Sequence, residues 1–341
     1  MTTLYLIRHG EAEGNRYRRC HGQYDSTITD NGYRQIAALA KRMEGVPIDA
    51  VYASDLTRTQ TTALAVTRTH KLALRLEPRL REVSVGAWED KTWTWLGKFD
   101  TERLVAFNTD AQRWAVEGGE TMARVRDRML AALYDIIAAH PNGNVAVVSH
   151  GMALRALVGT LNGLTLPEID KTGHAENTAV TKLEADGRGI RVVYANDASH
   201  LPDGLTTLHK QLWTKSKGGL EPGLWFAPDA EGRFAVMCED ARVGTVALGA
   251  VKGGVAEITE LRLDEPLRRR GFGVHLVGQA VSCARAHGCD TLRAEARGAL
   301  ARRRLAEYGF TQTGGAFEKY IGYDEAYRLR RFEEAYNQVK K

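Results

Sequence analysis

Short apolar runs alternate with segments of helical periodicity along the first part of the chain. The apolar runs span residues 4–7, 48–52 and 145–148, and the helical segments between them include 33–43 and 122–139. Runs of this length suit strands that are buried on both faces, and such strands with helices between them are typical of parallel sheets. We therefore predict an α/β fold in which a mainly parallel sheet carries helices on both faces.

A different pattern begins after residue 205. Strand-like runs at 234–237, 243–248, 255–263 and 292–294 accompany helical segments at 273–287 and 299–308. Residues 196–222 show little apolar periodicity and contain several glycines and lysines, which is typical of a connection. We therefore predict one domain over residues 1–205 and a smaller α+β domain over 206–323. Residues 324–341 predict an amphipathic helix with Ala326, Leu329 and Phe332 on one stripe, for packing or for a homodimer contact.

The net charge of +5 is confined to the second part of the chain. Residues 1–205 contain 25 Lys and Arg against 25 Asp and Glu, whereas residues 206–341 contain 22 against 17. This excess is small, and aromatic residues do not interleave with the basic ones as they do where proteins stack nucleic-acid bases. The charge would serve a polyanionic small molecule equally well, and we expect no nucleic-acid partner.

The cysteines and the hydropathy exclude several classes of protein. Cys20, Cys238, Cys283 and Cys289 form no C-x-x-C pair and no metal-ligand spacing with histidine, so we expect reduced thiols without a zinc site or disulfides. The N-terminus has no apolar leader, and no apolar run reaches about 18 residues, the length that a transmembrane helix needs. We expect a cytoplasmic protein with no membrane partner.

Polar residues follow each apolar run of the first domain. Arg8 and His9 follow the first run, Ser54 follows the second, and His150 follows the third. Since the carboxyl ends of parallel strands meet at one edge of a sheet, we expect these side chains to share one cleft. The two histidines are not spaced as a helical zinc pair, and no G-x-S-x-G motif supplies a serine nucleophile. What remains is a histidine nucleophile in a site without metal.

The neighbouring residues suit a phosphoryl group. Arg8 and Arg58 can each donate two hydrogen bonds to phosphate oxygens. Asn15 and a protonated His150 would add further donors. Glu82 is a candidate general acid, because a carboxyl beside phosphate charge can hold a proton for the leaving oxygen. These residues together predict chemistry on a phosphate ester.

Five motifs occur in one order along residues 1–200. They are L-I-R-H-G-E at 6–11 with Asn15, a G-x-x-D stretch from Gly22 to Gly32, S-x-L-x-R-T at 54–59, L-R-E at 80–82 with Gly86 and Trp88, and G-G-E-T at 118–121 followed by V-S-H-G at 148–151. This set resembles the histidine phosphatase superfamily, which includes the cofactor-dependent phosphoglycerate mutases. The resemblance implies a phosphoglycerate mutase-like fold that needs no cofactor for hydrolysis. It implies His9 as nucleophile, Arg8, Arg58 and His150 as phosphate pocket, Asn15 as a further phosphate contact and Glu82 as proton donor.

The substrate is less clearly marked. Six aromatic residues lie between Glu82 and Gly118, where the family caps its site, and an apolar or aromatic leaving group would fit them: Trp88, Trp93, Trp95, Phe99, Phe107 and Trp114. Arg18, Arg19 and His21 follow the nucleophile and could bind a second anionic group of a small-molecule phosphoester. Glu82 and His150 are only 68 positions apart. This is shorter than in the mutases that the chain resembles, so we favour a hydrolase, with a phosphoglycerate-type mutase carrying an accessory non-catalytic domain as the alternative.

The second domain carries a turn suited to an anion. Residues 266–273, P-L-R-R-R-G-F-G, follow a predicted strand and precede a predicted helix, so successive N–H groups of the turn would point at an anion. The order of elements from this turn to Gly309 resembles the GCN5-related N-acetyltransferases (GNAT). That resemblance implies that the turn holds the pyrophosphate of acetyl-CoA, through Arg268, Arg269, Arg270, Gly271, Phe272 and Gly273.

The resemblance to the acetyltransferases is less complete at the acid and the base. Leu305 stands where a tyrosine acid is expected, and Tyr308 follows one turn later. Glu257 and Glu260 are candidate bases. We therefore expect acetyl-CoA binding more than efficient transfer. Two arrangements remain open: a bifunctional phosphatase and N-acetyltransferase, and a phosphatase regulated by an acyl-CoA-sensing domain.

Overall fold

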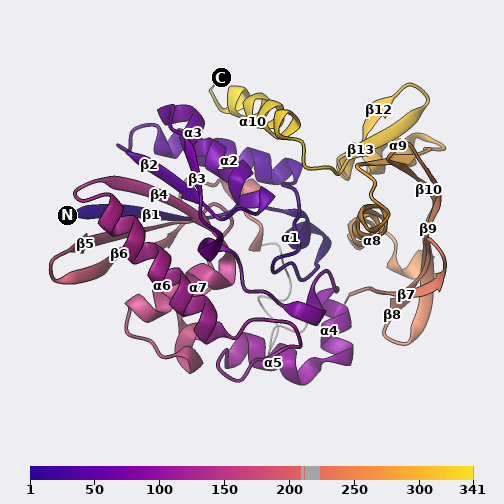
Figure 1. The fold of residues 1–341 in the computed structure, drawn as a ribbon. Helices are drawn as coiled ribbons and strands as arrows, with labels where there is room; N and C mark the ends of the chain where they lie inside the picture. The colour runs from indigo at the N-terminus through magenta and orange to yellow at the C-terminus, as the bar shows by residue number, and fades with distance from the viewer. Residues whose placement is uncertain (209–210, 212–222, 341) are drawn as a thin grey trace.

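The chain forms two separate sheets, each covered by its own helices (Figure 1). The computed structural model describes residues 1–208, 211 and 223–340. The first sheet has six strands in the order β3-β2-β4-β1-β5-β6, and the second has seven in the order β12-β13-β11-β10-β9-β8-β7. Part of the predicted connection, residues 209–210 and 212–222, lies outside the described residues. Among the described residues, no helix combines the length and the apolar character needed to cross a bilayer.

The first sheet is parallel except at one edge. Its strands are β1 (Thr2–Arg8), β2 (Ala50–Ala53), β3 (Leu74–Leu76), β4 (Asn144–Ser149), β5 (Val180–Asp186) and β6 (Gly189–Asp197). The first four pair in parallel, whereas β5 is antiparallel to both β1 and β6. The predicted mainly parallel α/β fold is confirmed, with an antiparallel edge that the sequence pattern did not indicate.

Helices cover both faces of this sheet, because its central strands are apolar on both sides. The helices of this domain are α1 (Glu13–Tyr17), α2 (Asp30–Met43), α3 (Thr57–His70), α4 (Trp93–Phe99), α5 (Thr101–Thr109), α6 (Met122–Ala139) and α7 (Gly151–Leu161). Leu4 and Leu6 of β1 belong to the core shared with α6 and α7. Ile7 of β1 belongs to the opposite core, shared with α2 and α3. This alternation follows from the two-residue period of a strand.

The second domain packs its sheet against α8 (Gly273–Ala286). Its strands are β7 (Trp225–Ala230), β8 (Arg233–Cys238), β9 (Ala241–Lys252), β10 (Val255–Leu263), β11 (Thr291–Ala294), β12 (Thr311–Thr313) and β13 (Ala316–Tyr320), and α9 (Ala299–Glu307) follows β11. Strands β10 and β11 are parallel and pair only as far as Ile258 and Ala294, although β10 continues to Leu263. The predicted strands and helices of this domain are confirmed, whereas β7, β12 and β13 were not predicted.

Short 3-10 segments connect several of these elements. They lie at Pro78–Leu80, Gly86–Trp88, Leu166–Thr172, Asp203–Leu205 and Glu265–Leu267. The last of them leads from β10 into the basic turn before α8, so that turn is joined closely to the sheet.

The final helix, α10 (Glu325–Val339), returns to the first domain and packs on α2 (Figure 1). Phe332, Ala335 and Tyr336 are buried in the core that α2 shares with the first sheet. The predicted packing role is confirmed for Phe332. Ala326 is exposed, so the predicted stripe is wrong at that position, because the buried face continues toward the C-terminal end of the helix.

The two domains meet where α8 lies against α1 (Figure 1). Tyr17 of α1 is only 4% exposed, and its neighbours are the core residues of the second domain. A Cβ added at Gly278 of α8 would lie 2.5 Å from the Cβ of Tyr17, so only glycine allows this close approach. The short helix that follows the predicted nucleophile is therefore built into the second domain.

Candidate active site

His9 lies at the carboxyl end of β1, buried and held in one tautomer. Its Nδ1 lies 2.8 Å from the carbonyl oxygen of Gly10, which can only accept, so Nδ1 carries the proton and Nε2 is bare. Burial lowers the pKa of His9 well below its usual 6.5, and the positive charges of Arg58 and Arg8 lower it further. A neutral imidazole with a bare nitrogen is the form that can attack phosphorus.

His150 and Arg58 lie beside His9, and of the two only Arg58 lines the cavity next to it, because His150 is fully buried. The rings of His150 and His9 are 5.3 Å apart between centroids. Arg58 Nε donates to His150 Nδ1 at 3.2 Å, which places the His150 proton on Nε2, within 2.9 Å of Ser54 Oγ. Burial, then Arg58, lowers the pKa of His150 well below 6.5, which favours the neutral ring. A bound phosphate would offset these causes and favour the cation.

Arg8 carries a buried donor that lacks a protein partner. Its NH1 donates to the carbonyl oxygen of Ala175, whereas its Nε, also buried, has no hydrogen-bond partner among the described residues. Ser26 Oγ and His21 Nδ1 are two further buried polar atoms without a partner in the described part of the chain, and both residues line the same cavity. Buried polar atoms are costly when unpaired, so these three mark a place where a polar ligand would be stabilised.

Glu82 faces this cavity from the loop before the second 3-10 segment. Its Oε1 accepts from the N–H groups of Val83 and Ala153, at 3.0 and 2.8 Å, and its Oε2 accepts from Met152 N–H at 3.0 Å. Two of these donors belong to the first turn of α7, which begins directly after His150. The carboxyl group is thereby held in one orientation beside the two histidines.

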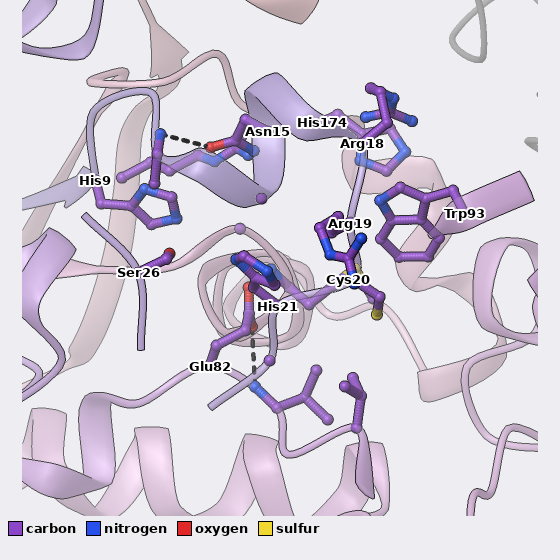
Figure 2. A pocket seen from close by; sticks show the side chains of 18 of the residues that line it. His9, Asn15, Arg18, Arg19, Cys20, His21, Ser26, Glu82, Trp93 and His174 are labelled. Atoms are coloured by element: carbon purple, nitrogen blue, oxygen red, sulfur yellow. Dashed lines mark hydrogen bonds between the residues drawn. The ribbon is translucent and has the colours of Figure 1, made fainter. Parts of the chain in front are cut away.

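His9, Arg8, Arg58 and Glu82 line one partly open cavity of about 150 Å³, called here the catalytic pocket after its proposed role. Figure 2 shows His9 and Ser26 on one side of it and Trp93 with His174 on the other. Phe107 also lines the pocket, whereas Trp88 and Trp114 are core residues. The polar side fits a phosphoryl group, and the aromatic side lies where a leaving group would extend.

The basic turn of the second domain lies at the start of α8. Gly271 has φ of +87°, and no atom lies within 4 Å of the place where its Cβ would stand. The N–H groups of Gly271, Phe272 and Gly273 make no hydrogen bond within the described residues, and no side chain caps the helix. Gly273 is different, since a Cβ there would lie 2.1 Å from the Tyr308 hydroxyl. A side chain at Gly273 would therefore have to displace the Tyr308 hydroxyl, whatever ligand binds.

Residues 4–198 match the family model of the histidine phosphatase superfamily, branch 1. The chain belongs to the histidine phosphatase superfamily. Residues 203–310 match the model of the acetyltransferase (GNAT) family, so one chain carries both domains. The predicted combination of domains is confirmed.

The relatives of this histidine phosphatase include both mutases and phosphatases. A probable phosphoglycerate mutase GpmB of Erwinia tasmaniensis is 32% identical over 208 residues, which are 60% of this chain and 96% of the mutase. Phosphoserine phosphatase 1 of Hydrogenobacter thermophilus is 29% identical, over 62% of this chain and all of the phosphatase. Among solved structures, YhfR of Bacillus stearothermophilus aligns with a TM-score of 0.57 at 33% identity, over 59% of this chain and 99% of YhfR. A mycobacterial glucosyl-3-phosphoglycerate phosphatase in complex with VO3 aligns at 0.54 and 26%, over 57% and 98%.

The loop after α1 divides its residues between this histidine phosphatase's pocket and the domain interface. Arg18, Arg19, Cys20 and His21 all line the pocket. The Arg19 guanidinium, however, donates to Asp90 at 2.5 and 3.1 Å and to Gln279 of α8 at 3.0 Å. Arg19 therefore has a structural contact with the second domain in addition to its place on the pocket wall. His21 Nε2 also lies 2.9 Å from Asp90, and its Nδ1 lies beside Gly14 of α1, where a Cβ would come within 2.7 Å of it.

Several residues of the pocket were missed from the sequence. Ser26 and His174 line the pocket, and Asn177 donates to the backbone oxygen of His9 at 2.8 Å. Burial, then Arg155 and Arg8, lowers the pKa of His174 to about 3. Ser26 lies at an unassigned position of the Gly22–Gly32 stretch, and His174 and Asn177 belong to no motif that we recognised, so no residue pattern singled them out. Asn15, which was expected to contact the phosphate, lies on α1 at the pocket wall.

Proposed function

We propose that this protein is a metal-independent phosphoric monoester hydrolase that acts through a phosphohistidine on His9. The observation that carries the proposal is the tautomer of His9, which leaves its Nε2 without a proton. The ring has Arg8, Arg58 and His150 as neighbours. The unpartnered Nε of Arg8 supports it, because a phosphate oxygen would supply the missing acceptor.

In the first step, His9 Nε2 attacks phosphorus and the bond from phosphorus to the ester oxygen breaks. The charge on the three remaining phosphoryl oxygens would be stabilised by Arg8, by Arg58 and by His150, which is protonated at this stage. Glu82, protonated beside the phosphate, gives its proton to the leaving oxygen, so the product is a neutral alcohol. The enzyme is left with a phosphorylated His9 and an ionised Glu82.

In the second step, Glu82 takes a proton from water while the water oxygen bonds to phosphorus. The bond from phosphorus to His9 Nε2 breaks, and inorganic phosphate leaves. Glu82 regains its proton and His9 its bare nitrogen, so the cycle closes without a metal.

The test is His9→Ala with 4-nitrophenyl phosphate, alongside His140→Ala, which replaces a histidine outside the pocket. We expect His9→Ala to lose at least about a hundredfold in kcat and His140→Ala to stay near the parent. Quenching the parent enzyme in alkali during turnover should reveal phosphohistidine. Survival of most activity in His9→Ala would overturn the covalent mechanism, and so would activity that a chelator abolishes, because the metal-free site would then be wrong.

The alternative of a phosphoglycerate-type mutase differs in the acceptor of the phosphoryl group. Several relatives are named probable phosphoglycerate mutases, so the alternative has a definite substrate to test. With 3-phosphoglycerate, a hydrolase releases inorganic phosphate, whereas a mutase returns the 2-phosphoglycerate isomer. We favour hydrolysis with release of inorganic phosphate, because the segment between Glu82 and His150 is short and supplies only α4 and α5 to cover the pocket.

For the second domain we propose binding of an acyl-CoA thioester without efficient transfer. The unbonded N–H groups at the start of α8 support the diphosphate site. The strands β10 and β11 separate after Ile258 and Ala294, which leaves backbone groups that amides of the pantetheine arm can pair with. Glu260, a candidate base, is paired with Arg233 and Arg262 at 3.1 and 3.3 Å, and Tyr308 lies against Gly273. Calorimetry of the full chain with acetyl-CoA tests binding, and release of free thiol with amines tests transfer.

A further inference from the structure

A second cavity, of about 540 Å³, lies between the two domains. The first domain supplies part of its wall from α1 and α2, and the second domain supplies Arg270 to Phe272, Tyr308 and Lys319. We call it the interdomain cavity. It is distinct from the catalytic pocket, but Asn15, Arg18 and Gln211 line both.

Positive charge without a partner gathers on this cavity from both domains. Arg16 and Arg34 belong to the first domain and Arg270 to the second, and in the described part of the chain none of the three forms an ion pair with a carboxylate. Arg34 donates one hydrogen bond, to Asn31 Oδ1 at 3.4 Å, and Arg270 lies over the Phe272 ring. These guanidinium groups are exposed and remain available to an anion.

The acidic residues on the same cavity are already engaged by other groups. Asp30 pairs with Arg331 at 2.7 Å, and Glu307 pairs with Arg303 and Arg304 at 2.9 and 2.6 Å. Glu11 accepts hydrogen bonds from the hydroxyl groups of Thr29 and Thr207, at 2.7 and 2.9 Å. Glu11 has no cationic partner among the described residues, but five cationic residues line the cavity against three carboxylates, so the charge that faces it is positive on balance.

The start of α8 adds backbone donors to one side of this cavity. The N–H groups of Gly271 to Gly273 have no acceptor among the described residues, and the space beside Gly271 is open. A diphosphate at this turn would share the cavity with Arg16 and Arg34, because all of them line it. Separate groups of donors on the two domains suit a ligand with phosphate groups at two places.

We propose that the interdomain cavity is a composite site for coenzyme A, in which the phosphatase domain binds the phosphate that the acetyltransferase-type turn does not. The diphosphate lies at the start of α8 and Arg270, and the 3′-phosphate of the ribose lies on Arg16 and Arg34. This rests on the proposed acyl-CoA binding, and it adds that the first domain forms half of the site. Arg16 and Asn15 are neighbours on α1, and Asn15 lines the catalytic pocket. A phosphate bound to Arg16 therefore contacts a helix that also forms part of that pocket.

The experiment compares CoA with 3′-dephospho-CoA by calorimetry on the full chain. The test variant is Arg16→Gln combined with Arg34→Gln, and the control is Arg113→Gln, an exposed arginine that lines neither cavity. We expect the double variant to bind CoA about tenfold more weakly, while its affinity for 3′-dephospho-CoA changes less than about twofold. The control should bind both ligands like the parent.

Three results would overturn the proposal, and they differ in what else fails. Equal CoA binding by parent and double variant would remove the composite site and leave the turn as the CoA site. Equal weakening of CoA and 3′-dephospho-CoA would show that the arginines do not recognise the 3′-phosphate. No CoA binding by the parent at millimolar concentration would overturn both this proposal and the proposed acyl-CoA binding.

Discussion

Arg285 of α8 and Glu13 of α1 form a buried ion pair that joins the two domains. Arg285 NH1 and NH2 donate to the two carboxylate oxygens of Glu13 at 2.5 and 3.1 Å, and the side chains are 8% and 4% exposed. Glu13 Oε2 also accepts from Thr27 N–H at 3.1 Å. The pair therefore fixes α1, the loop at Thr27 and α8 relative to one another.

Removing one member of this pair should destabilise the whole chain. Arg285→Met leaves the Glu13 carboxylate buried without its partner, which costs about 3–5 kcal/mol. Arg330→Met is the control, because Arg330 and Glu334 are exposed and 4.0 Å apart, and it should cost less than about 1 kcal/mol. Urea unfolding followed by fluorescence measures both. Equal midpoints for the two variants would contradict the assignment.

The same pair predicts how stability depends on pH. Burial alone would raise the pKa of Glu13, but the charge and hydrogen bonds of Arg285 outweigh it and lower the pKa below the usual 4.5. A carboxyl group whose pKa is lower in the folded chain than in the unfolded chain stabilises the fold at pH values above the unfolded-state pKa. This stabilisation is lost as the pH falls through the folded-state pKa. The difference in unfolding free energy between the parent and Glu13→Gln should therefore be constant above pH 4.5 and shrink below it. A difference that grew on acidification would contradict this prediction.

Gln279 and Ser282 of α8 should act as positioning residues for the catalytic pocket. Gln279 accepts from Arg19, and the Ser282 hydroxyl donates to Asp90, the carboxylate that also binds His21. Gln279→Leu combined with Ser282→Ala should raise KM for a phosphoester about fivefold and leave kcat within about twofold, because His9 and Glu82 are untouched. Gln312→Leu, on the exposed strand β12, is the control. A fall in kcat at unchanged KM would exclude a positioning role on substrate binding.

The acid limb of the activity profile should lie at low pH. Burial and the two arginines lower the pKa of His9 well below 6.5, so the nucleophile stays unprotonated as pH falls through that value. We expect kcat/KM for 4-nitrophenyl phosphate to decline only well below pH 6.5, after correction for the substrate's own ionisation measured by phosphorus NMR. Half-loss of kcat/KM at or above pH 6.5 would contradict a neutral His9.

Glu82→Gln should distinguish good from poor leaving groups. A nitrophenolate leaves without a proton, whereas an alkoxide needs one, so the variant should lose at least about tenfold more activity on alkyl phosphates than on 4-nitrophenyl phosphate. Glu120→Gln is the matched control, since Glu120 pairs with Arg128 at 2.9 Å outside the pocket. Equal losses on both substrates would remove Glu82 as the acid.

Trp93 should contribute to recognition of the leaving group. It lines the catalytic pocket, whereas its neighbour Trp95 does not and packs on Phe99 at 5.1 Å between centroids. Trp93→Ala should raise KM for aryl phosphates by about tenfold through lost apolar contact, with little change for a methyl phosphate. Trp95→Ala should leave both values near the parent. A uniform rise for both substrates in Trp93→Ala would indicate a folding defect.

The parts of the site that lie at strand ends could be predicted from the sequence. Arg8, His9 and His150 follow apolar runs, and the pairing of β1 with β4 brings those runs side by side in register. Their convergence needs only the rule that parallel strands end at one edge. Ser26, His174 and Asn177 could not be predicted in this way, because their loops are placed by packing between segments far apart in the sequence.

Arg19 and Gly273 make structural contacts that the sequence did not indicate. Both lie in segments whose neighbours bind or are expected to bind a ligand, so both were assigned to ligands as well. In the structure Arg19 turns to Asp90 and α8, and Gly273 makes room for Tyr308. Which residue faces a ligand and which faces a neighbouring helix depends on the partner surface, and the chain's local pattern does not contain that information.

The return of α10 to the first domain has a consequence for biosynthesis. On the ribosome the residues of the first sheet emerge early, but Phe332 and Tyr336, which cover α2, are made only after the second domain. Until then an apolar face of α2 stays open to chaperones or to other nascent chains. A fragment that stops after the first sheet would keep that face open permanently, so aggregation during expression is the expected fate of the isolated phosphatase domain.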